Sequence, residues 1–325
     1  MNQLIRLTDA GFYCPAGDFY IDPIRPVKKA VITHAHADHA QAGHQYYLAH
    51  PHTVAFMQHR LGKEFYYESL SYHEEKHIGE VSVVFYPSGH VPGGAQVLLT
   101  HKGQKWLITG DYKLEDDGLA APFESVACDV MLTESTFGLP IFNWTPQDLL
   151  HQQISQWWEK NQKENRPVVL AAYAFGKAQR LLKRLDENQG PIYAHGAIFN
   201  MVEVYRSLGF ELPKVSKITP ELKSSDFENA LIMATPSAMA SEWGKRFKNA
   251  SRGMASGWMQ MRGSRRRPAL DSGFVLSDHA DWKGLLTAIK AAAPQKVYVY
   301  HGFSDVLARY LQTIGLEAED IQGLK

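Results

Sequence analysis

Six consecutive residues near the start of the chain hold three histidines and one aspartate. They are His34-Ala-His36-Ala-Asp38-His39, and they follow the apolar segment Ala30–Ile32. Neutral imidazole nitrogens and carboxylate oxygens are ligands of Zn²⁺ and of its first-row neighbours. The spacing predicts that His34 and His36 bind one metal ion from the end of a strand, while Asp38 and His39 face a second. A histidine-rich surface loop is the alternative, which we disfavour because ionisable groups packed so densely are costly unless they are paired or coordinated.

Three further candidate ligands each stand just past a predicted strand. They are His90, in a glycine-rich turn, Asp111, after the run Trp106–Gly110, and His301, after the run Val297–Tyr300. Loops at the ends of rigid elements are where binding and catalytic residues concentrate. A single histidine of this kind is more often structural, but four sites of one type favour a metal centre.

Taken together, these motifs resemble those of the metallo-β-lactamase superfamily. Three more motifs narrow the resemblance to its β-CASP branch of nucleases: Leu132-Thr-Glu134-Ser-Thr136, Ser277-Asp-His279-Ala-Asp281 and Tyr300-His301-Gly302. Within that branch, the segments Thr133–Pro140 and Phe274–His279 look most like the bacterial DNA-ligase-associated exonucleases, which are Artemis-like. The resemblance covers almost the whole chain. It implies an α/β fold, the metallo-β-lactamase αβ/βα sandwich with an inserted α/β β-CASP domain.

The resemblance also implies how the metal ligands divide. One divalent ion would be held by His34, His36 and His90, and a second by Asp38, His39 and His301, with Asp111 bridging the two. We expect two zinc ions, with manganese as the alternative. Two such ions lower the pKa of a shared water and brace the charge that develops in an in-line phosphoryl displacement.

The family pattern gives roles to further ionisable residues. Asp22 matches the first acidic motif of the superfamily and is expected to hold a ligand imidazole in its correct tautomer; its alternative is a turn residue before Pro23. Catalytic roles are expected for Asp38, for His279 as the general acid, and for Glu134. The Glu134 carboxylate would raise the pKa of His279 and keep it protonated near neutral pH. The alternative for His279 is a cap of the following helix.

Two segments of the predicted inserted domain are candidates for binding substrate. In Ala174–Gln179, Gly176 and Lys177 stand where family members start a helix whose N-terminus faces a phosphate. Exposed amides and the helix dipole favour an anion at such a position. The second segment is the basic run Arg265-Arg266-Arg267 near Trp258, which is expected to follow a nucleic-acid backbone or to stack on a base. A solvated loop is an equal alternative for this run.

Length, composition and charge set the broad class. The chain has 325 residues, of which 45% are hydrophobic, and its two distant cysteines do not read as a disulfide framework. There is no signal-peptide pattern, and no apolar run approaches the roughly 20 residues of a membrane span, so we expect a cytoplasmic protein with no membrane partner. Between Ile141 and Pro268, 19 Lys and Arg stand against 11 Asp and Glu, whereas the remainder has 15 against 23. This asymmetry suits a polyanionic substrate, with an ordinary solvated surface as the alternative.

The candidate ligands need strands that end at one place. Short β-branched or aromatic runs predict strands at Phe19–Asp22, Ala30–Thr33, Tyr46–Ala49, Val81–Tyr86, Ala95–Thr100, Lys105–Thr109 and Asp129–Thr133. From Thr145 the pattern changes to alternating helices and strands, which predicts a small parallel α/β unit. The strand-and-ligand pattern returns near Gly273, followed by helices at Trp282–Ala292 and about Asp305–Ile314. We therefore predict a metallo-β-lactamase domain at residues 1–141 and 269–325, interrupted by a β-CASP domain at residues 142–268.

The leading hypothesis is a dinuclear-metal DNA exonuclease that hydrolyses phosphodiester bonds at single-stranded or frayed DNA ends during repair. A DNA ligase and a helicase of the same pathway are the expected protein partners. The alternative within the same chemistry is a β-CASP ribonuclease that processes RNA, and His301 favours it because RNA-directed relatives have histidine in that motif. The basic inserted domain disfavours a lactonase or thioesterase, and the complete ligand set disfavours a non-catalytic scaffold.

Overall fold

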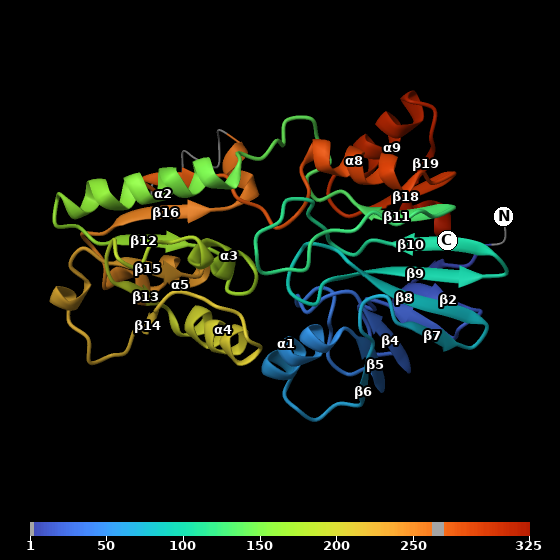
Figure 1. Ribbon diagram of the computed structural model, residues 1–325, viewed down its shortest axis with the longest axis horizontal. Helices are drawn as coiled ribbons and strands as arrows, with labels where there is room; N and C mark the ends of the chain where they lie inside the picture. The colour runs from blue at the N-terminus through green and yellow to red at the C-terminus, as the bar shows by residue number, and fades with distance from the viewer. Residues whose placement is uncertain (1–2, 262–269) are drawn as a thin grey trace. The chain divides into compact units, whose positions relative to one another are not determined.

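The computed structural model describes residues 3–261 and 270–325 (Figure 1). The chain forms two compact units. The discontinuous unit consists of Met1–Phe142 and His279–Lys325, and the inserted unit consists of Asn143–Asp278. The sequence placed the second boundary at residue 268, whereas the inserted unit continues to Asp278. It does so because strand β17 (Ser272–Phe274) pairs with β16 (Ser251–Ala255) of the inserted sheet.

The discontinuous unit contains two sheets. The first has the order β1-β2-β3-β4-β5-β6, and its strands are Arg6–Thr8, Gly11–Cys14, Phe19–Ile21, Lys29–Ile32, Tyr46–Ala49 and Tyr67–Ser69. The second has the order β19-β18-β11-β10-β9-β8-β7. From β7 to β11 its strands are Glu75–Ile78, Val81–Pro87, Ala95–His101, Gln104–Ile108 and Val130–Glu134, and β18 and β19 are Lys296–Tyr300 and Glu317–Asp320. The helices of this unit are α1 (Pro51–Leu61), α8 (Trp282–Ala292) and α9 (Ser304–Thr313), with a short 3-10 turn, η3, at Ile321–Leu324.

One hydrophobic core lies between these two sheets. Phe19 and Val31 of the first sheet belong to the same buried cluster as Phe85 and Trp106 of the second. The opposite face of the second sheet is covered by α8 and α9, as Figure 1 shows, and Leu285 is among the side chains that they bury there. Two facing sheets with helices outside form the αβ/βα sandwich that the sequence motifs implied, and the α/β fold class is confirmed.

The strands that precede candidate site residues run parallel to one another. β3 pairs in parallel with β4, and β11 pairs in parallel with both β10 and β18. Asp22 and His34 therefore follow neighbouring parallel strands of the first sheet. Asp111, Glu134 and His301 stand in the same way at the ends of β10, β11 and β18. Because the carboxyl ends of parallel strands meet at one edge of a sheet, each sheet brings its own share of the site to a single edge.

The inserted unit is built on a parallel sheet of order β14-β13-β15-β12-β16-β17. The strands not yet given are β12 (Val168–Ala171), β13 (Ile192–Ala194), β14 (Ser216–Lys217) and β15 (Leu231–Ala234). The helical segments are α2 (Gln147–Gln162), α3 (Lys177–Lys183), α4 (Gly196–Ser207), η1 (Ser224–Phe227), α5 (Pro236–Ala240), α6 (Glu242–Lys245) and η2 (Gly257–Gln260). Apolar side chains such as Trp158, Leu170 and Leu181 form its own core. No helix in residues 3–261 and 270–325 combines the length and the apolar character that a membrane span requires.

Candidate metal centre

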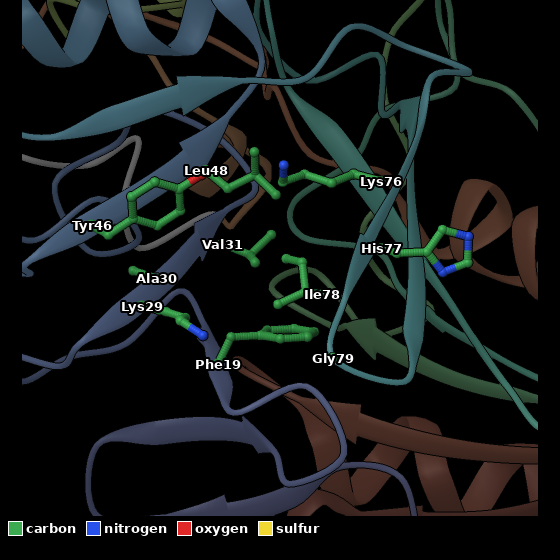
Figure 2. Close-up of a pocket in the computed structure, with 10 residues that line it drawn as sticks. All are labelled: Phe19, Lys29, Ala30, Val31, Tyr46, Leu48, Lys76, His77, Ile78 and Gly79. Carbon is green, nitrogen blue, oxygen red and sulfur yellow. The ribbon is translucent and has the colours of Figure 1, made fainter.

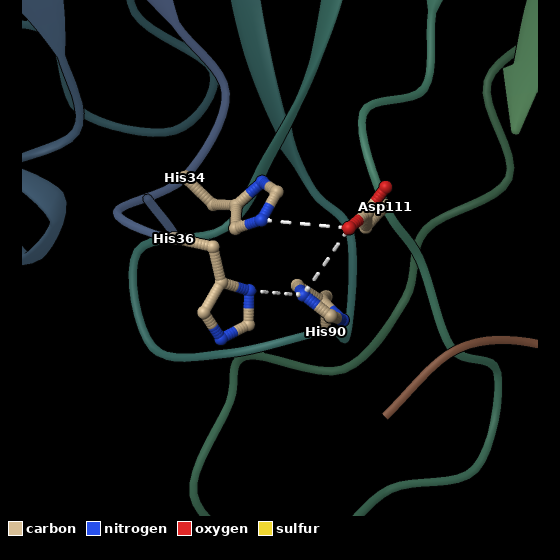
Figure 3. A group of neighbouring side chains, drawn as sticks. All are labelled: His34, His36, His90 and Asp111. Carbon is tan, nitrogen blue, oxygen red and sulfur yellow. Dashed lines mark hydrogen bonds and ion pairs between the residues drawn. The ribbon is translucent and has the colours of Figure 1, made fainter. Parts of the chain in front are cut away.

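Three imidazoles and one carboxylate form the first group of candidate ligands (Figure 3). His34 and His36 come from the loop after β4, His90 from the turn between β8 and β9, and Asp111 from the loop after β10. One ligand atom of each lies within 4.8 Å of the others. The Nε2 atoms of His34 and His90 are 3.5 and 3.7 Å from Oδ2 of Asp111. Nε2 of His90 is also 3.0 Å from Nδ1 of His36. Donors from three separate segments thus converge on one point.

His39, Asp111 and His301 form a second group, again with ligand atoms within 4.8 Å of one another. Nε2 of His39 lies 3.5 Å from the same Oδ2 atom of Asp111. Asp111 therefore belongs to both groups, as a bridging ligand would. The seventh predicted ligand, Asp38, belongs to neither group: its side chain is 75% exposed, and its Oδ2 atom is 3.9 Å from Nε2 of His39.

Several polar atoms at this centre are buried without a hydrogen-bond partner among the described residues. They are Nε2 of His34, Nε2 of His39 and Oδ1 of Asp111, on side chains that are at most 5% exposed. Leaving a buried polar group unsatisfied costs about 1–3 kcal/mol, so such atoms are rare in folded proteins. A divalent cation satisfies imidazole nitrogens and a carboxylate oxygen together. The residues at this site therefore fit divalent metal ions.

The pKa values of His34, His39 and Asp111 are shifted far from their ordinary values. Burial lowers the pKa of His34 well below its ordinary value, and the neighbouring His39 lowers it further. Burial also opposes protonation of His39, but the carboxylates of Asp111 and Asp22 raise its pKa well above the ordinary value. For Asp111, burial acts to raise the pKa, yet the imidazoles around it hold the pKa well below that of an ordinary carboxyl. Asp111 is thus an anion at the centre of a ring of imidazoles.

Asp22 and Thr33 orient two of the imidazoles from behind. Oδ2 of Asp22 is 2.7 Å from Nδ1 of His39, and the Thr33 hydroxyl oxygen is 3.1 Å from Nδ1 of His34. Thr33 also donates its backbone N–H to Asp22 at 2.8 Å and its hydroxyl to the same carboxylate. Because Nδ1 of each imidazole is held by a hydrogen bond, Nε2 faces Asp111. Nε2 is then the nitrogen left without a proton to bind a metal ion. The sequence pointed to Asp22 but missed Thr33, because a threonine at the end of a strand has no distinctive signal.

His279 and Glu134 form a hydrogen-bonded pair beside the first two groups. Nδ1 of His279 is 2.9 Å from Oε1 of Glu134 and 3.8 Å from Oδ2 of Asp111. Glu134 is completely buried, and its carboxylate also accepts two backbone N–H groups at 3.1 Å. The carboxylate is therefore rigidly placed, and it fixes the imidazole through Nδ1. The helix that follows, α8, is capped by the side chain of Asp281, which accepts the N–H of the first turn.

Two glycines let the backbone approach closely next to candidate ligands. Gly89 has a φ of 71°, and a Cβ atom there would meet the carbonyl oxygen of Lys113. Gly302 has a φ of 59°, and a Cβ atom would meet the carbonyl oxygen of Ser135. Side chains larger than hydrogen are strained in this region of φ. The glycines that precede His90 and follow the last candidate ligand are therefore required by the local backbone.

The residues predicted to bind substrate belong to the inserted unit. Gly176 and Lys177 are buried at the start of α3, whereas the prediction needed them to face a phosphate. The ammonium of Lys177 lies 3.9 Å from Oδ2 of Asp278, and Arg180 lies 3.6 Å from Oδ1 of the same carboxylate. Burial lowers the pKa of Lys177, and Asp278 opposes that effect. Substrate contact by Gly176 and Lys177 stays a prediction, and Arg265, Arg266 and Arg267 lie outside the described residues.

A cavity of about 280 Å³ in the discontinuous unit is separate from the candidate ligands (Figure 2). Its lining includes Phe19, Val31 and Ile78, with the stems of Lys29 and Lys76 beside them. None of the ten residues drawn there is a predicted metal ligand. The side chains with metal chemistry stand at strand ends, so we do not identify this largely apolar cavity with the metal centre.

Comparison with known proteins gives several relatives, although no family model matches the chain. A protein named probable DNA ligase from Opitutus terrae is 30% identical over 310 residues, which cover 95% of this chain and 30% of the relative. An RNase J-like protein from Methanocaldococcus jannaschii is 27% identical over 261 residues, covering 68% of this chain and 61% of the relative. The cleavage and polyadenylation specificity factor 73 of Drosophila melanogaster is 29% identical over 201 residues, covering 54% of this chain and 29% of the relative. The chain thus spans less than two thirds of the length of each of these relatives.

A solved structure supports the fold alone. It is a protein of unknown function from Enterococcus faecalis, which matches with a TM-score of 0.59 and 15% identity. The match covers 86% of this chain and 76% of that one. Both units therefore have counterparts in a single experimentally determined chain.

Proposed function

Because this chain belongs to the β-CASP branch of the metallo-β-lactamase superfamily, we propose that it is a metal-dependent nuclease that hydrolyses phosphodiester bonds. One observation carries the proposal, namely that a single carboxylate lies next to both groups of candidate ligands and next to the candidate proton donor. Asp111 belongs to both groups of candidate ligands and lies 3.8 Å from Nδ1 of His279. Candidate ligands and a candidate proton donor therefore meet around one side chain.

The proposed ligand assignment follows the two groups. His34, His36 and His90 would hold one divalent ion, and His39, His301 and Asp38 a second, with Asp111 bridging. Zinc is the proposed ion, with manganese as the alternative. Two such ions supply a water of lowered pKa and positive charge to stabilise the phosphoryl group under attack. Asp38 has the weakest geometric support of the seven ligands because its carboxylate is exposed.

The remaining residues donate a proton or orient the imidazoles. His279 donates a proton to the leaving oxygen, and Nε2 is the nitrogen suited to this because Nδ1 faces Glu134. The burial of Glu134 keeps water from competing for its contact with Nδ1 of His279. Asp22 keeps His39 in the tautomer that presents Nε2 to Asp111.

The proposed substrate is DNA, cleaved from single-stranded or frayed ends. The relative named probable DNA ligase contains a segment similar to 95% of this chain, which supports a ligase as a functional partner. A helicase would supply frayed ends to the same process. RNA is the second candidate substrate, because the relatives named RNase J-like protein and cleavage and polyadenylation specificity factor 73 are also similar to this chain.

The substrate is tested by incubating metal-loaded protein with end-labelled single-stranded DNA, duplex DNA and RNA of one sequence. We expect short products released from the ends of single-stranded DNA, and little cleavage of a closed single-stranded circle. Rapid cleavage of the circle would rule out a requirement for ends. A strong preference for the RNA strand would contradict DNA as the substrate and support RNA instead.

The metal stoichiometry is tested by elemental analysis after reconstitution with excess zinc or manganese. We expect about two ions per chain, since two ligand groups share one bridging residue. Asp111→Ala should lower both occupancies, whereas Asp116→Ala, an exposed position in the same loop, should lower neither. One ion or fewer in the unmodified protein would contradict the dinuclear assignment, and loss of only one ion in Asp111→Ala would make that residue a terminal ligand.

A further inference from the structure

Among the described residues of the inserted unit, four large hydrophobic side chains are exposed. Leu149 lies on α2, whereas Tyr173, Trp258 and Met261 follow the carboxyl ends of β12 and β16. Tyr173 is 58% exposed and Trp258 is 41% exposed. β12 and β16 are neighbouring parallel strands, with Ala171 opposite Met254. Two large aromatic rings thus stand in adjacent loops at one edge of one sheet.

The strand order at this edge is the kind that favours ligand binding in open α/β sheets. The connection from β12 leads through α3 to β13, on one side, while the connection from β16 leads to β17, on the other. Where neighbouring parallel strands send their connections in opposite directions, the loops diverge and leave a crevice at the carboxyl ends, and open α/β sheets bind their ligands there.

The connections diverge a second time, between β13 and β15, but the polar side chains there are used within the fold. His195 follows β13 and accepts the N–H of Ala197 as the cap of α4. Thr235 follows β15 and accepts the N–H of Ala238 as the cap of α5. At the divergence between β12 and β16, Tyr173 and Trp258 each keep more than a third of their surface exposed to solvent.

We propose that Tyr173 and Trp258 form a platform on which bases of single-stranded nucleic acid stack. The ammonium of Lys177 lies 4.9 Å from the centre of the Tyr173 ring, so a cation–π contact helps to fix the orientation of this ring, and a base would stack on its other face. Ser256 accepts the backbone N–H of Trp258 and fixes the turn that presents the indole. The excess of Lys and Arg over Asp and Glu between Ile141 and Pro268 complements a polyanion.

This inference rests on the proposed function, and it names the residues that would account for the proposed preference for unpaired strands. Aromatic stacking accepts every base because every base has a π face, so the platform would be indifferent to sequence. In a duplex these faces are covered by neighbouring base pairs. The platform therefore favours unpaired strands over duplexes, and it binds bases while other groups bind phosphates.

The test compares two strands that differ only in their bases. The full-length, zinc-loaded protein is titrated with a labelled oligothymidylate and with an abasic strand of equal length, both with phosphorothioate linkages that resist hydrolysis. We expect Tyr173→Ala and Trp258→Ala each to weaken binding of the base-bearing strand by about 5- to 100-fold, and to leave binding of the abasic strand unchanged. Tyr173→Phe and Trp258→Phe should restore most of the affinity. Leu149→Ala is the matched control, since Leu149 is equally exposed on a helix of the same unit.

The outcomes separate this proposal from the proposed function. Equal losses for both strands, or no loss for either, would overturn the platform. Hydrolysis of bis(p-nitrophenyl) phosphate, which has no base to stack, reports the metal chemistry separately. If the variants hydrolyse this ester normally yet bind oligothymidylate as well as the unmodified protein does, the platform fails and the nuclease proposal stands. If the unmodified protein lacks phosphodiesterase activity but discriminates bases through these residues, the nuclease proposal fails instead.

Discussion

The pairing of Asp22 with His39 leads to a prediction about one metal ion of the two. Oδ2 of Asp22 is 2.7 Å from Nδ1 of His39, and Asp22 has a φ of 43°. Asn, like Asp, tolerates this left-handed backbone better than most residues other than Gly do, so Asp22→Asn changes the charge without straining the chain. The substitution replaces a carboxylate oxygen by an amide and removes the acceptor that selects the His39 tautomer.

Loss of such an outer partner typically weakens metal affinity about 10–100-fold, which corresponds to about 1.4–2.7 kcal/mol. The effect should fall on the ion that His39 holds, because Asp22 contacts no other candidate ligand directly among its described hydrogen bonds. Thr33→Val should have the converse selectivity, since the Thr33 hydroxyl lies 3.1 Å from Nδ1 of His34. The expected loss there is only about 2–10-fold, because a neutral hydrogen bond contributes about 0.5–1.5 kcal/mol.

Competition with a chelator of known zinc affinity measures the two binding steps separately. Asp18→Asn is the control, because Asp18 also has a left-handed backbone, with a φ of 50°, but is exposed and bonded to Tyr13. We expect two unchanged affinities in the control, one weakened step in Asp22→Asn, and the other step weakened in Thr33→Val. Equal weakening of both steps by Asp22→Asn would refute the assignment of His39 to an ion of its own.

Three further substitutions test other parts of the fold. If Glu134 positions His279, and His279 is the proton donor, Glu134→Gln should slow hydrolysis about 10²–10⁴-fold with metal content retained. Loss of metal would contradict this role of Glu134. Arg180→Met should lower the free energy of unfolding in urea by about 3–5 kcal/mol, because it leaves the Asp278 carboxylate buried without this cation; a change below 1 kcal/mol would show that the site relaxes. Burial lowers the pKa of His151 to about 4, so the protein loses stability as pH falls from about 6.5 toward 4, where only the unfolded state binds the proton. His151→Phe should flatten this pH dependence in urea titrations, and an unchanged slope would contradict it.

Six of the seven predicted ligands lie in groups of converging side chains, and the sequence pointed to them because they are unusual residues in short motifs. His34, His36 and His39 lie so close in the chain that the loop itself brings them together. His90, Asp111 and His301 came from three distant segments, and only the common position after a strand linked them. Spacing could not show that Asp38 would point to solvent, because a single rotamer decides whether a carboxylate in an exposed loop reaches the ion.

Sequence patterns were less informative for the inserted unit. Strands predicted at Pro167–Ala171 and Ile192–Ala194 correspond to β12 and β13, and the strand pattern near Gly273 corresponds to β17, whereas β14, β15 and β16 were not predicted. β15 is a four-residue apolar run that lacks the β-branched or aromatic enrichment typical of strands, and β16 contains Gly253 and Arg252. These strands exist because they complete a sheet around β12, so the tertiary context overrides weak local preferences.

The same argument applies to the residues expected to bind substrate. Lys177 has the positive charge expected of a phosphate ligand, but its ammonium lies beside the buried carboxylate of Asp278. Tyr173 and Trp258 gave no motif, and they become meaningful only when the strand order places their loops side by side at a point of divergence. A metal ligand is recognised by its atoms, whereas a stacking residue is recognised by its exposure. Because the sheet topology sets this exposure, the fold must be known before the residues of a stacking surface can be identified.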